Sequence, residues 1–246
     1  MSRGLGRSVL VVSLAALLAA TTRAEHLPTA APAILQRFFE LDAPSPTQCR
    51  ALRHLEARNE KFEKSAWMDV WTEADASGFR YTIVAEDGSE YIRSKVFRAS
   101  LDTERKMWGA GTGEQSALTP ANYVFEDRGA QPDSEGLAAM TMTPRRQDAM
   151  LVNGTIYLNP ENGELVRIEG RLSKPPSFWT RHVKIVRWYR RIAGFQMPTA
   201  LESEANVRVA GISTFRMSYD YESINGQHVG NPQPKMLARA SIAARP

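Results

Sequence analysis

Apolar and polar residues alternate in several stretches of the middle and C-terminal parts of the chain. Four stretches show the pattern most clearly: Phe79–Ile83, Val166–Glu169, Val207–Val209 and Thr214–Tyr219. Successive side chains of a strand point to opposite faces, so each stretch predicts a strand with one apolar face and one polar, solvent-exposed face. We therefore expect a mainly β protein whose antiparallel sheet is covered on one side.

Turn dipeptides separate these stretches. They are Asp87-Gly88, Asn153-Gly154, Asn162-Gly163 and Asn225-Gly226. Such pairs are favoured in two-residue hairpin loops because both central residues take positive φ. The first three are flanked by strand-like apolar runs, which predicts an antiparallel meander.

Two segments have the spacing of a helix instead. Apolar residues recur every three or four positions in Ala33–Leu41 and again in Ser94–Trp108. Pro44 and Pro46 end the first predicted helix, and Gly109 ends the second.

The basic aromatic segment Phe178–Ile192 fits two conformations. On a helix its bases would form one stripe, a pattern typical of a membrane surface or an acidic partner: Arg181, Lys184, Arg187 and Arg190. Its β-branched and aromatic content favours a strand, as does the preceding Pro175-Pro176. In that strand Arg187 would share the apolar side with Tyr189 and would need a partner or a water-filled opening.

The first 24 residues have the pattern of a secretory signal. Arg3 and Arg7 precede the apolar run Val9–Ala20, and Thr22-Arg23-Ala24 offers small residues for cleavage. We expect an exported, periplasmic chain organised as a signal peptide (1–24), an N-terminal helix with a Pro-rich segment (25–47), a half-barrel domain (48–229) and a flexible tail (230–246).

Charge and cysteine content narrow the possible partners. The 246 residues include 31 Lys and Arg against 27 Asp and Glu, and removal of residues 1–24 takes away three arginines and no acid. The remaining balance is 28 − 27, or +1, so binding to nucleic acid driven by net charge is not expected. Cys49 is the single cysteine and cannot form an intramolecular disulfide, which suits a bacterial periplasm. We expect a monomer.

We find no catalytic or metal-binding motif. The four histidines are scattered, and on one strand Asp69 and Glu73 would lie about 13 Å apart, too far for one metal ion. These acids and Asp75 are expected to be solvated charges at an edge. No enzyme activity, cofactor or metal is therefore expected. An enzyme would be favoured only if His54, His182 or His228 met a carboxylate in a cleft.

From Glu60 to Gly226 the chain resembles the periplasmic outer-membrane lipoprotein-sorting proteins, the superfamily of the lipoprotein carrier. The motifs that carry the resemblance are Trp67–Val70, Gly88–Arg93 before a helix, Pro144-Arg145-Arg146, Tyr157–Pro160, Arg167–Gly170, Pro175 with Ser177-Phe178-Trp179, Pro198, and Met217–Tyr221. The likeness is to a branch distinct from the carrier itself, and its motifs are architectural.

The resemblance implies a strongly curved antiparallel half-barrel sheet with helices covering its concave face. That face would hold a lipid or a lipoprotein acyl chain, without enzymatic turnover. The apolar residues expected to line it are Met68, Val70, Phe79, Tyr81, Ile83, Met140, Met142, Val166, Ile168, Val183, Ile185, Val207, Val209, Phe215, Met217 and Tyr219. The alternative for the same residues is an ordinary protein core.

A second hypothesis is an envelope sensor or protein-interaction module that uses the surface Phe178–Arg191. Its partner-binding residues would be Trp179, Arg181, Arg187 and Arg190.

Overall fold

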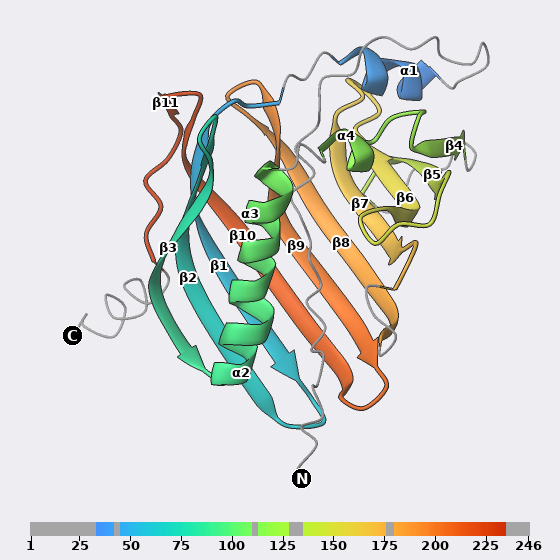
Figure 1. Ribbon diagram of the computed structural model, residues 1–246. Helices are drawn as coiled ribbons and strands as arrows, with labels where there is room; N and C mark the ends of the chain where they lie inside the picture. Colours follow the sequence, from blue (N-terminus) through green and yellow to red (C-terminus); the bar gives the residue numbers. More distant parts are fainter. Residues whose placement is uncertain (1–32, 42–44, 110–112, 128–134, 176–179, 235–246) are drawn as a thin grey trace.

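The computed structural model of the protein describes residues 33–41, 45–109, 113–127, 135–175 and 180–234 (Figure 1). Its helical segments are α1 (Ala33–Glu40), α2 (Glu90–Ile92), η1 (Arg93–Arg98), α3 (Ala99–Gly109) and α4 (Gly113–Ser116). Its strands are β1 (Cys49–Asn59), β2 (Lys64–Asp75), β3 (Gly78–Gly88), β4 (Tyr123–Asp127), β5 (Ala138–Pro144), β6 (Val152–Leu158), β7 (Leu165–Leu172), β8 (Thr180–Ile192), β9 (Phe195–Val207), β10 (Gly211–Ile224) and β11 (Gln227–His228). The expected signal peptide, Trp179 and the residues from 235 onward lie outside the described residues.

The strands form one open antiparallel sheet. Ten of them follow the order β3-β2-β1-β10-β9-β8-β7-β6-β5-β4, and β11 pairs with β10. β1 pairs with β10, so the first and last long strands meet inside the sheet and the edges are β3 and β4. The sheet curves around a helix on its inner face (Figure 1), which confirms the expected fold class.

One continuous helical segment crosses the inner face. It consists of α2, η1 and α3, begins at Glu90 and ends at Gly109, four residues before the start and one after the end that the sequence predicts. Phe97 and Leu101 point from it toward the sheet and are fully buried. Among the helices of the described residues, none is long and apolar enough to cross a membrane.

The predicted helix Ala33–Leu41 is confirmed as α1, but it does not lie beside α3. Figure 1 shows it at one end of the sheet, next to β4 and the β6–β7 turn. Arg37 donates from Nη1 to the Pro160 and Glu161 carbonyls, at 3.3 and 3.2 Å. The Phe39 and Phe125 rings pack together with their centroids 5.4 Å apart. α1 therefore caps an end of the half-barrel.

Of the four predicted two-residue turns, the one at Asn225-Gly226 is confirmed: it joins β10 to β11 with φ of 48° and 78°. Asn162-Gly163 also lies between two paired strands, but the loop from β6 to β7 is longer than two residues and only Gly163 has a positive φ, of 78°. The prediction at Asp87-Gly88 is wrong, because β3 ends at Gly88 and a helix, not a second strand, follows. Gly88 instead lies directly against the backbone of Ser65 and Ala66 on β2, where a side chain would not fit.

The prediction at Asn153-Gly154 is also wrong. Both residues lie within β6, where Asn153 pairs with Arg171 and Gly154 with Gly170 of β7. An added Cβ on Gly154 would fall onto the Glu169 carbonyl and 2.5 Å from the Gly170 Cα. The glycine therefore serves close approach of two strands and not a turn.

The basic aromatic segment is a strand, as its composition favoured. In β8 the buried side chains are Thr180, Val183, Ile185, Arg187 and Tyr189. Arg181 and Arg190 are exposed, and Lys184 forms an ion pair with Glu204 at 3.2 Å.

Candidate functional site

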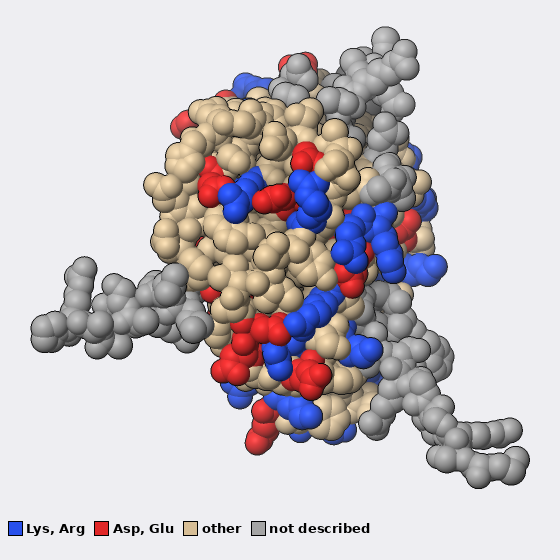
Figure 2. Space-filling model, turned by 60° about the vertical axis from the view of Figure 1, so that its left-hand side comes forward, with Lys and Arg blue, Asp and Glu red and all other residues tan. Residues whose placement is uncertain are grey.

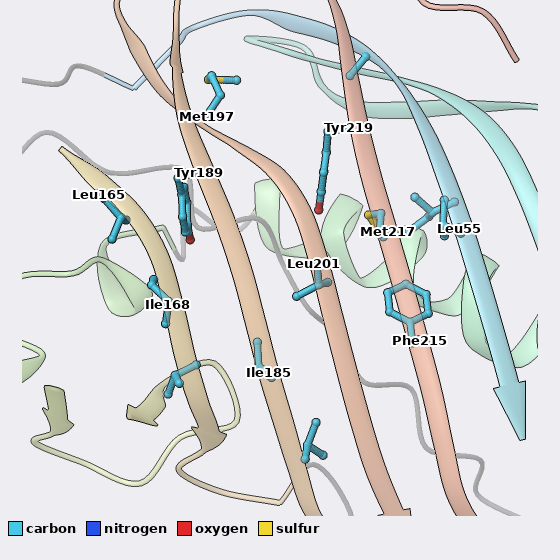
Figure 3. Close-up of a cluster of buried hydrophobic side chains, with 14 of the residues drawn as sticks. Leu55, Leu165, Ile168, Ile185, Tyr189, Met197, Leu201, Phe215, Met217 and Tyr219 are labelled. Carbon is cyan, nitrogen blue, oxygen red and sulfur yellow. The ribbon is translucent and has the colours of Figure 1, made fainter. Parts of the chain in front are cut away.

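The inner face of the sheet carries a continuous row of cross-strand neighbours. From β7 to β2 the row is Ile168, Arg187, Leu201, Met217, Leu55 and Met68. None of these residues is more than 6% exposed. Figure 3 shows Ile168, Leu201 and Met217 pointing to the same side of their strands. Antiparallel alternation has thus gathered five apolar side chains and Arg187, from six strands, onto one wall.

Methionine is prominent on this wall, which continues from Ile168 through its partner Ile156 on β6 to Met140 on β5. Four methionines of the wall are at most 2% exposed and come from three strands: Met68, Met140, Met142 and Met217. Methionine is unbranched and polarizable, so it adapts to irregular apolar shapes.

Most of the predicted apolar positions lie in this interior. Eleven are buried in the core: Met68, Val70, Phe79, Met140, Met142, Ile168, Val183, Ile185, Phe215, Met217 and Tyr219. Tyr81, Ile83 and Val207 are partly buried and pack against it, whereas Val166 is half-buried and outside the core cluster. Val209 was placed wrongly, because β9 ends at Val207 and Val209 is 53% exposed in the following turn.

A buried ion pair that was not expected from the sequence joins the helix to the sheet. Arg53 of β1 donates from both terminal nitrogens to the carboxylate oxygens of Glu104 on α3, at 2.6 and 2.9 Å. Both side chains are at most 7% exposed. Burial opposes the charge of Arg53, but the Glu104 carboxylate outweighs it and raises the pKa of Arg53.

One signal of this pair is present in the helix pattern. Glu104 lies three residues after Leu101 and four before Trp108, so it occupies a position on the apolar stripe. The spacing places Arg105 on the stripe equally well, but in the structure Glu104 is buried and Arg105 is exposed. Arg53 has no comparable signal, since β1 carries charged residues on both of its faces.

Arg187 lies in the same interior. It is 6% exposed, and its Nη1 is 3.5 Å from the Tyr189 hydroxyl. Burial disfavours its charge, yet Tyr189, Tyr219 and Glu104 raise the pKa of Arg187 above its usual value. The expectation that Arg187 needs a polar partner is therefore met. Its assignment to an exposed partner-binding surface is wrong, because the alternation of β8 turns it inward.

Further polar contacts fasten the helix along its length. Arg93 and Arg98 contact Glu86 at 2.8 and 2.5 Å, the Tyr81 hydroxyl donates to Asp102 at 2.9 Å, and Trp108 Nε1 donates to the Asp75 carbonyl at 3.1 Å. With the Arg53–Glu104 pair, these contacts all reach β1, β2 or β3. Among the described residues, the helix is thus hydrogen-bonded to one side of the half-barrel.

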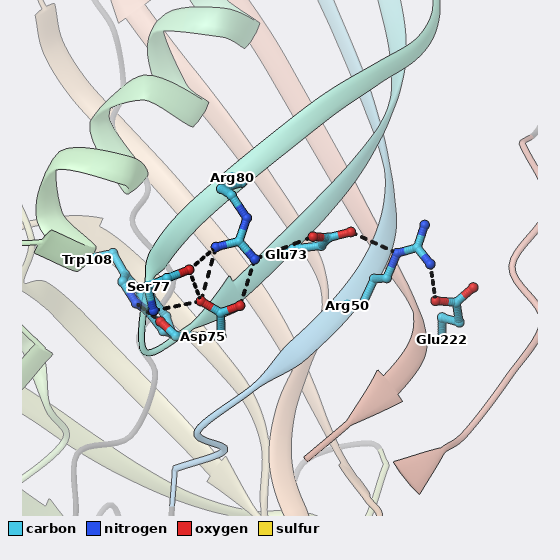
Figure 4. A network of polar contacts seen from close by, with 7 residues as sticks. All are labelled: Arg50, Glu73, Asp75, Ser77, Arg80, Trp108 and Glu222. Carbon is cyan, nitrogen blue, oxygen red and sulfur yellow. Dashed lines mark hydrogen bonds and ion pairs between the residues drawn. The ribbon is translucent and has the colours of Figure 1, made fainter. Parts of the chain in front are cut away.

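A surface network connects the β2–β3 turn, beside Trp108, with the start of β1 and the end of β10 (Figure 4). Arg50 bridges Glu222 and Glu73 at 2.7 and 3.1 Å, and Arg80 contacts Asp75 at 2.6 Å. Hydrogen bonds from Arg80 and Ser77 hold the pKa of Asp75 well below its usual value. Glu73 and Asp75 are therefore paired with arginines and are not isolated solvated charges. Basic and acidic side chains are likewise intermixed over the face seen in Figure 2.

Asp69 was expected at a solvated edge and is instead fully buried. Its Oδ1 is 2.5 Å from His54 Nδ1, and His54 Nε2 is 2.8 Å from Glu56 Oε1. These residues lie on the outer face of β1 and β2, opposite to Arg53 and Met68. The structure thus brings His54 to two carboxylates. Both ring nitrogens face carboxylate oxygens, and the contact with Asp69 links β1 to β2.

His182 and His228, the other two histidines of the described residues, are exposed. His26 lies outside the described residues. Within the described ranges, no group of three or more His, Cys, Asp or Glu could hold a metal ion.

Cys49 provides a test of the interior electrostatics. Burial raises the pKa of its thiol from 9.0 to about 11, an effect that Arg53 opposes and Glu104 reinforces. At pH 9 about half of the unfolded thiol is ionised but only about 1% of the folded thiol, so alkylation of the native protein should be about 50-fold slower.

Iodoacetamide labelling of native and urea-unfolded protein at pH 9, followed by mass spectrometry, measures this difference. The folded state holds the proton more tightly, so this group stabilises the fold below pH 9 and its contribution is lost as pH rises to 11. Equal labelling rates would show that the thiol is accessible.

Comparisons with known proteins concern architecture. No protein-family model and no curated protein matches the chain. An outer membrane lipoprotein-sorting protein domain from Vibrio parahaemolyticus matches with a TM-score of 0.42 and 8% identity, covering 85% of this chain and 96% of that one. A LolA superfamily protein from Nitrosomonas europaea matches with a TM-score of 0.36 and 12% identity, covering 83% and 94%. A DUF1329 family protein from Desulfovibrio piger matches with a TM-score of 0.38 and 9% identity, covering 76% and 88%.

Proposed function

We propose that this protein is a non-enzymatic periplasmic binding or transfer protein for a lipid or a lipoprotein acyl chain. The ligand would lie on the apolar inner face of the half-barrel, under the helix formed by α2, η1 and α3. Export to the periplasm is supported by the signal pattern in residues 1–24.

The observation that carries the proposal is the methionine-rich wall together with its one-sided cover. The wall extends from β2 to β5 across the sheet, whereas the helix is fastened by polar contacts to β1, β2 and β3. A helix held on one side can move away from the other without breaking the sheet. Methionine side chains could then rearrange around an apolar chain.

Burial of the ligand would supply the affinity. Each buried CH₂ contributes about 0.8 kcal/mol, so an acyl chain of about 14–16 carbons gains roughly 10 kcal/mol before ordering costs. Release would require the helix to move, and the Arg53–Glu104 pair is the most buried polar contact that such a movement would break.

Native mass spectrometry of the purified protein tests the proposal directly. We expect a fraction of the molecules to carry a co-purified lipid whose mass is lost on solvent extraction. A protein without any bound lipid that also fails to bind an added fatty acid would contradict the proposal.

A bulky substitution on the wall provides a second test. Ala205 on β9 is 5% exposed and belongs to the core cluster, next to Val183. Tryptophan at this position should reduce binding of a fluorescent fatty acid by at least tenfold, because it fills the space that the chain would take. The measurement is a fluorescence titration on protein whose folding is checked by circular dichroism.

The matched control is Ala200→Trp on the same strand. Ala200 pairs with Ser218 and lies on the outer side, so its replacement should leave fatty-acid binding unchanged. If Ala205→Trp keeps full affinity in a folded protein, the ligand does not occupy this part of the wall.

A further inference from the structure

Exposed apolar side chains gather at one end of the sheet. Of the six large hydrophobic side chains that are exposed among the described residues, four lie at this end: Phe62 (52%), Tyr91 (49%), Val209 (53%) and Ile212 (40%). Phe62 is in the β1–β2 turn, Val209 and Ile212 are at the β9–β10 turn, and Tyr91 is in α2. Figure 1 shows both turns and α2 at the end of the sheet away from α1. We call these four residues the apolar tip.

The two hairpin turns of the apolar tip are fastened to each other. Lys61 Nζ donates to the Val209 carbonyl at 2.9 Å, and Asn59 Nδ2 donates to the Ala210 carbonyl at 2.8 Å. The Phe62 amide donates to Asn59 Oδ1 at 2.9 Å. The start of α2 is held nearby, since the Ser89 amide donates to the Ser65 carbonyl at 2.8 Å. The apolar side chains are therefore presented by a fixed platform.

Basic residues lie on the two hairpin turns of the apolar tip. The segment Arg58–Lys64 carries three bases and two acids, and Arg208 in the facing turn adds a fourth base. Arg58, Lys64 and Arg208 are exposed. The two turns thus have a local charge of 4 − 2, or +2, whereas the acids Asp87 and Glu90 lie beside Tyr91.

We propose that the apolar tip docks on an anionic lipid surface. Protruding side chains on two hairpins enter the headgroup region readily, and a neighbouring positive charge favours a surface of negative charge. An aromatic residue with a hydroxyl, such as Tyr91, suits the boundary between water and acyl chains. The inner wall and its ligand take no part in this contact. A failure of the docking proposal would therefore leave the proposed lipid binding on the inner wall unaffected, and the reverse also holds.

Vesicle sedimentation tests the docking. The protein without residues 1–24 is mixed with vesicles of phosphatidylglycerol and phosphatidylcholine (3:7) or of phosphatidylcholine alone. We expect stronger binding to the anionic vesicles and a loss of at least tenfold for the triple variant Phe62→Ser, Val209→Ser, Ile212→Ser. Arg58→Glu with Lys64→Glu should abolish the preference for the anionic vesicles.

The matched control uses the two exposed hydrophobic residues that lie elsewhere. Val84 on β3 and Val124 on β4 are 43% and 38% exposed. Val84→Ser with Val124→Ser should leave vesicle binding unchanged, and circular dichroism checks the folding of every variant. The proposal is overturned if the triple variant binds like this control. It is also overturned if the wild-type protein binds neither kind of vesicle, which would leave a protein partner as the occupant of the apolar tip.

Discussion

Replacing Glu104 with leucine is expected to lower the free energy of unfolding by about 3–5 kcal/mol, because it leaves the buried Arg53 guanidinium without its counter-ion. The two side chains form two hydrogen bonds and are almost completely buried. Arg53→Met should have an effect of similar size for the opposite reason, an uncompensated carboxylate. Urea unfolding followed by tryptophan fluorescence measures both.

The double variant Arg53→Met, Glu104→Leu distinguishes a structural need for charge from the cost of a lone charge. Two well-packed apolar residues should recover most of the lost stability, since neither charge remains buried. Arg105→Met is the matched control on the same helix: its pair with Asp102 is exposed and should be worth less than about 1 kcal/mol. A double variant as unstable as the single ones would show that the ion pair is needed for the fold itself.

The double variant also bears on the proposed function. If the ion pair holds the helix against the sheet, a folded double variant should take up a fluorescent fatty acid faster than the wild type. Stopped-flow mixing measures this rate.

Gly154→Val is expected to have the second-largest effect, a loss of about 2–3 kcal/mol or failure to fold. The new side chain would meet the Glu169 carbonyl and the backbone of Gly170, and two paired strands would have to separate. Thermal unfolding followed by circular dichroism measures the loss.

Asn153→Val is the informative comparison for this substitution. If Asn153-Gly154 formed a hairpin turn, valine at a residue of positive φ would be strongly destabilising. In the structure Asn153 is an exposed strand residue whose φ is not positive, so valine should be tolerated or slightly stabilising. A large loss of stability for Asn153→Val would contradict the position of β6.

The strand and helix predictions show how much of the fold the sequence contains. The alternation at Phe79–Ile83 and Thr214–Tyr219 and the helical spacing of Ser94–Trp108 each correspond to an observed element. They succeed because one face of each element is apolar and the other polar. β1 was not predicted, since Arg53 and His54 are charged or polar residues on its two faces and both are buried.

The candidate site was predicted in its apolar part and missed in its polar part. Positions such as Met217 and Ile185 follow from the period of two. The partners of Arg53 and of Asp69 lie 51 and 15 residues away in the chain, on another element. No local pattern can specify such a pairing.

The sequence by itself determined a mainly β chain whose strands have one apolar face, together with a helix over Ser94–Trp108, because these properties depend on the spacing of residues within one element. The tertiary structure decided which charges are buried, Arg187 among them, why Gly154 is a glycine and where Val209 lies. Those outcomes depend on distances between strands and helices far apart in the chain, and burial of a charge is tolerated only where another element supplies its partner.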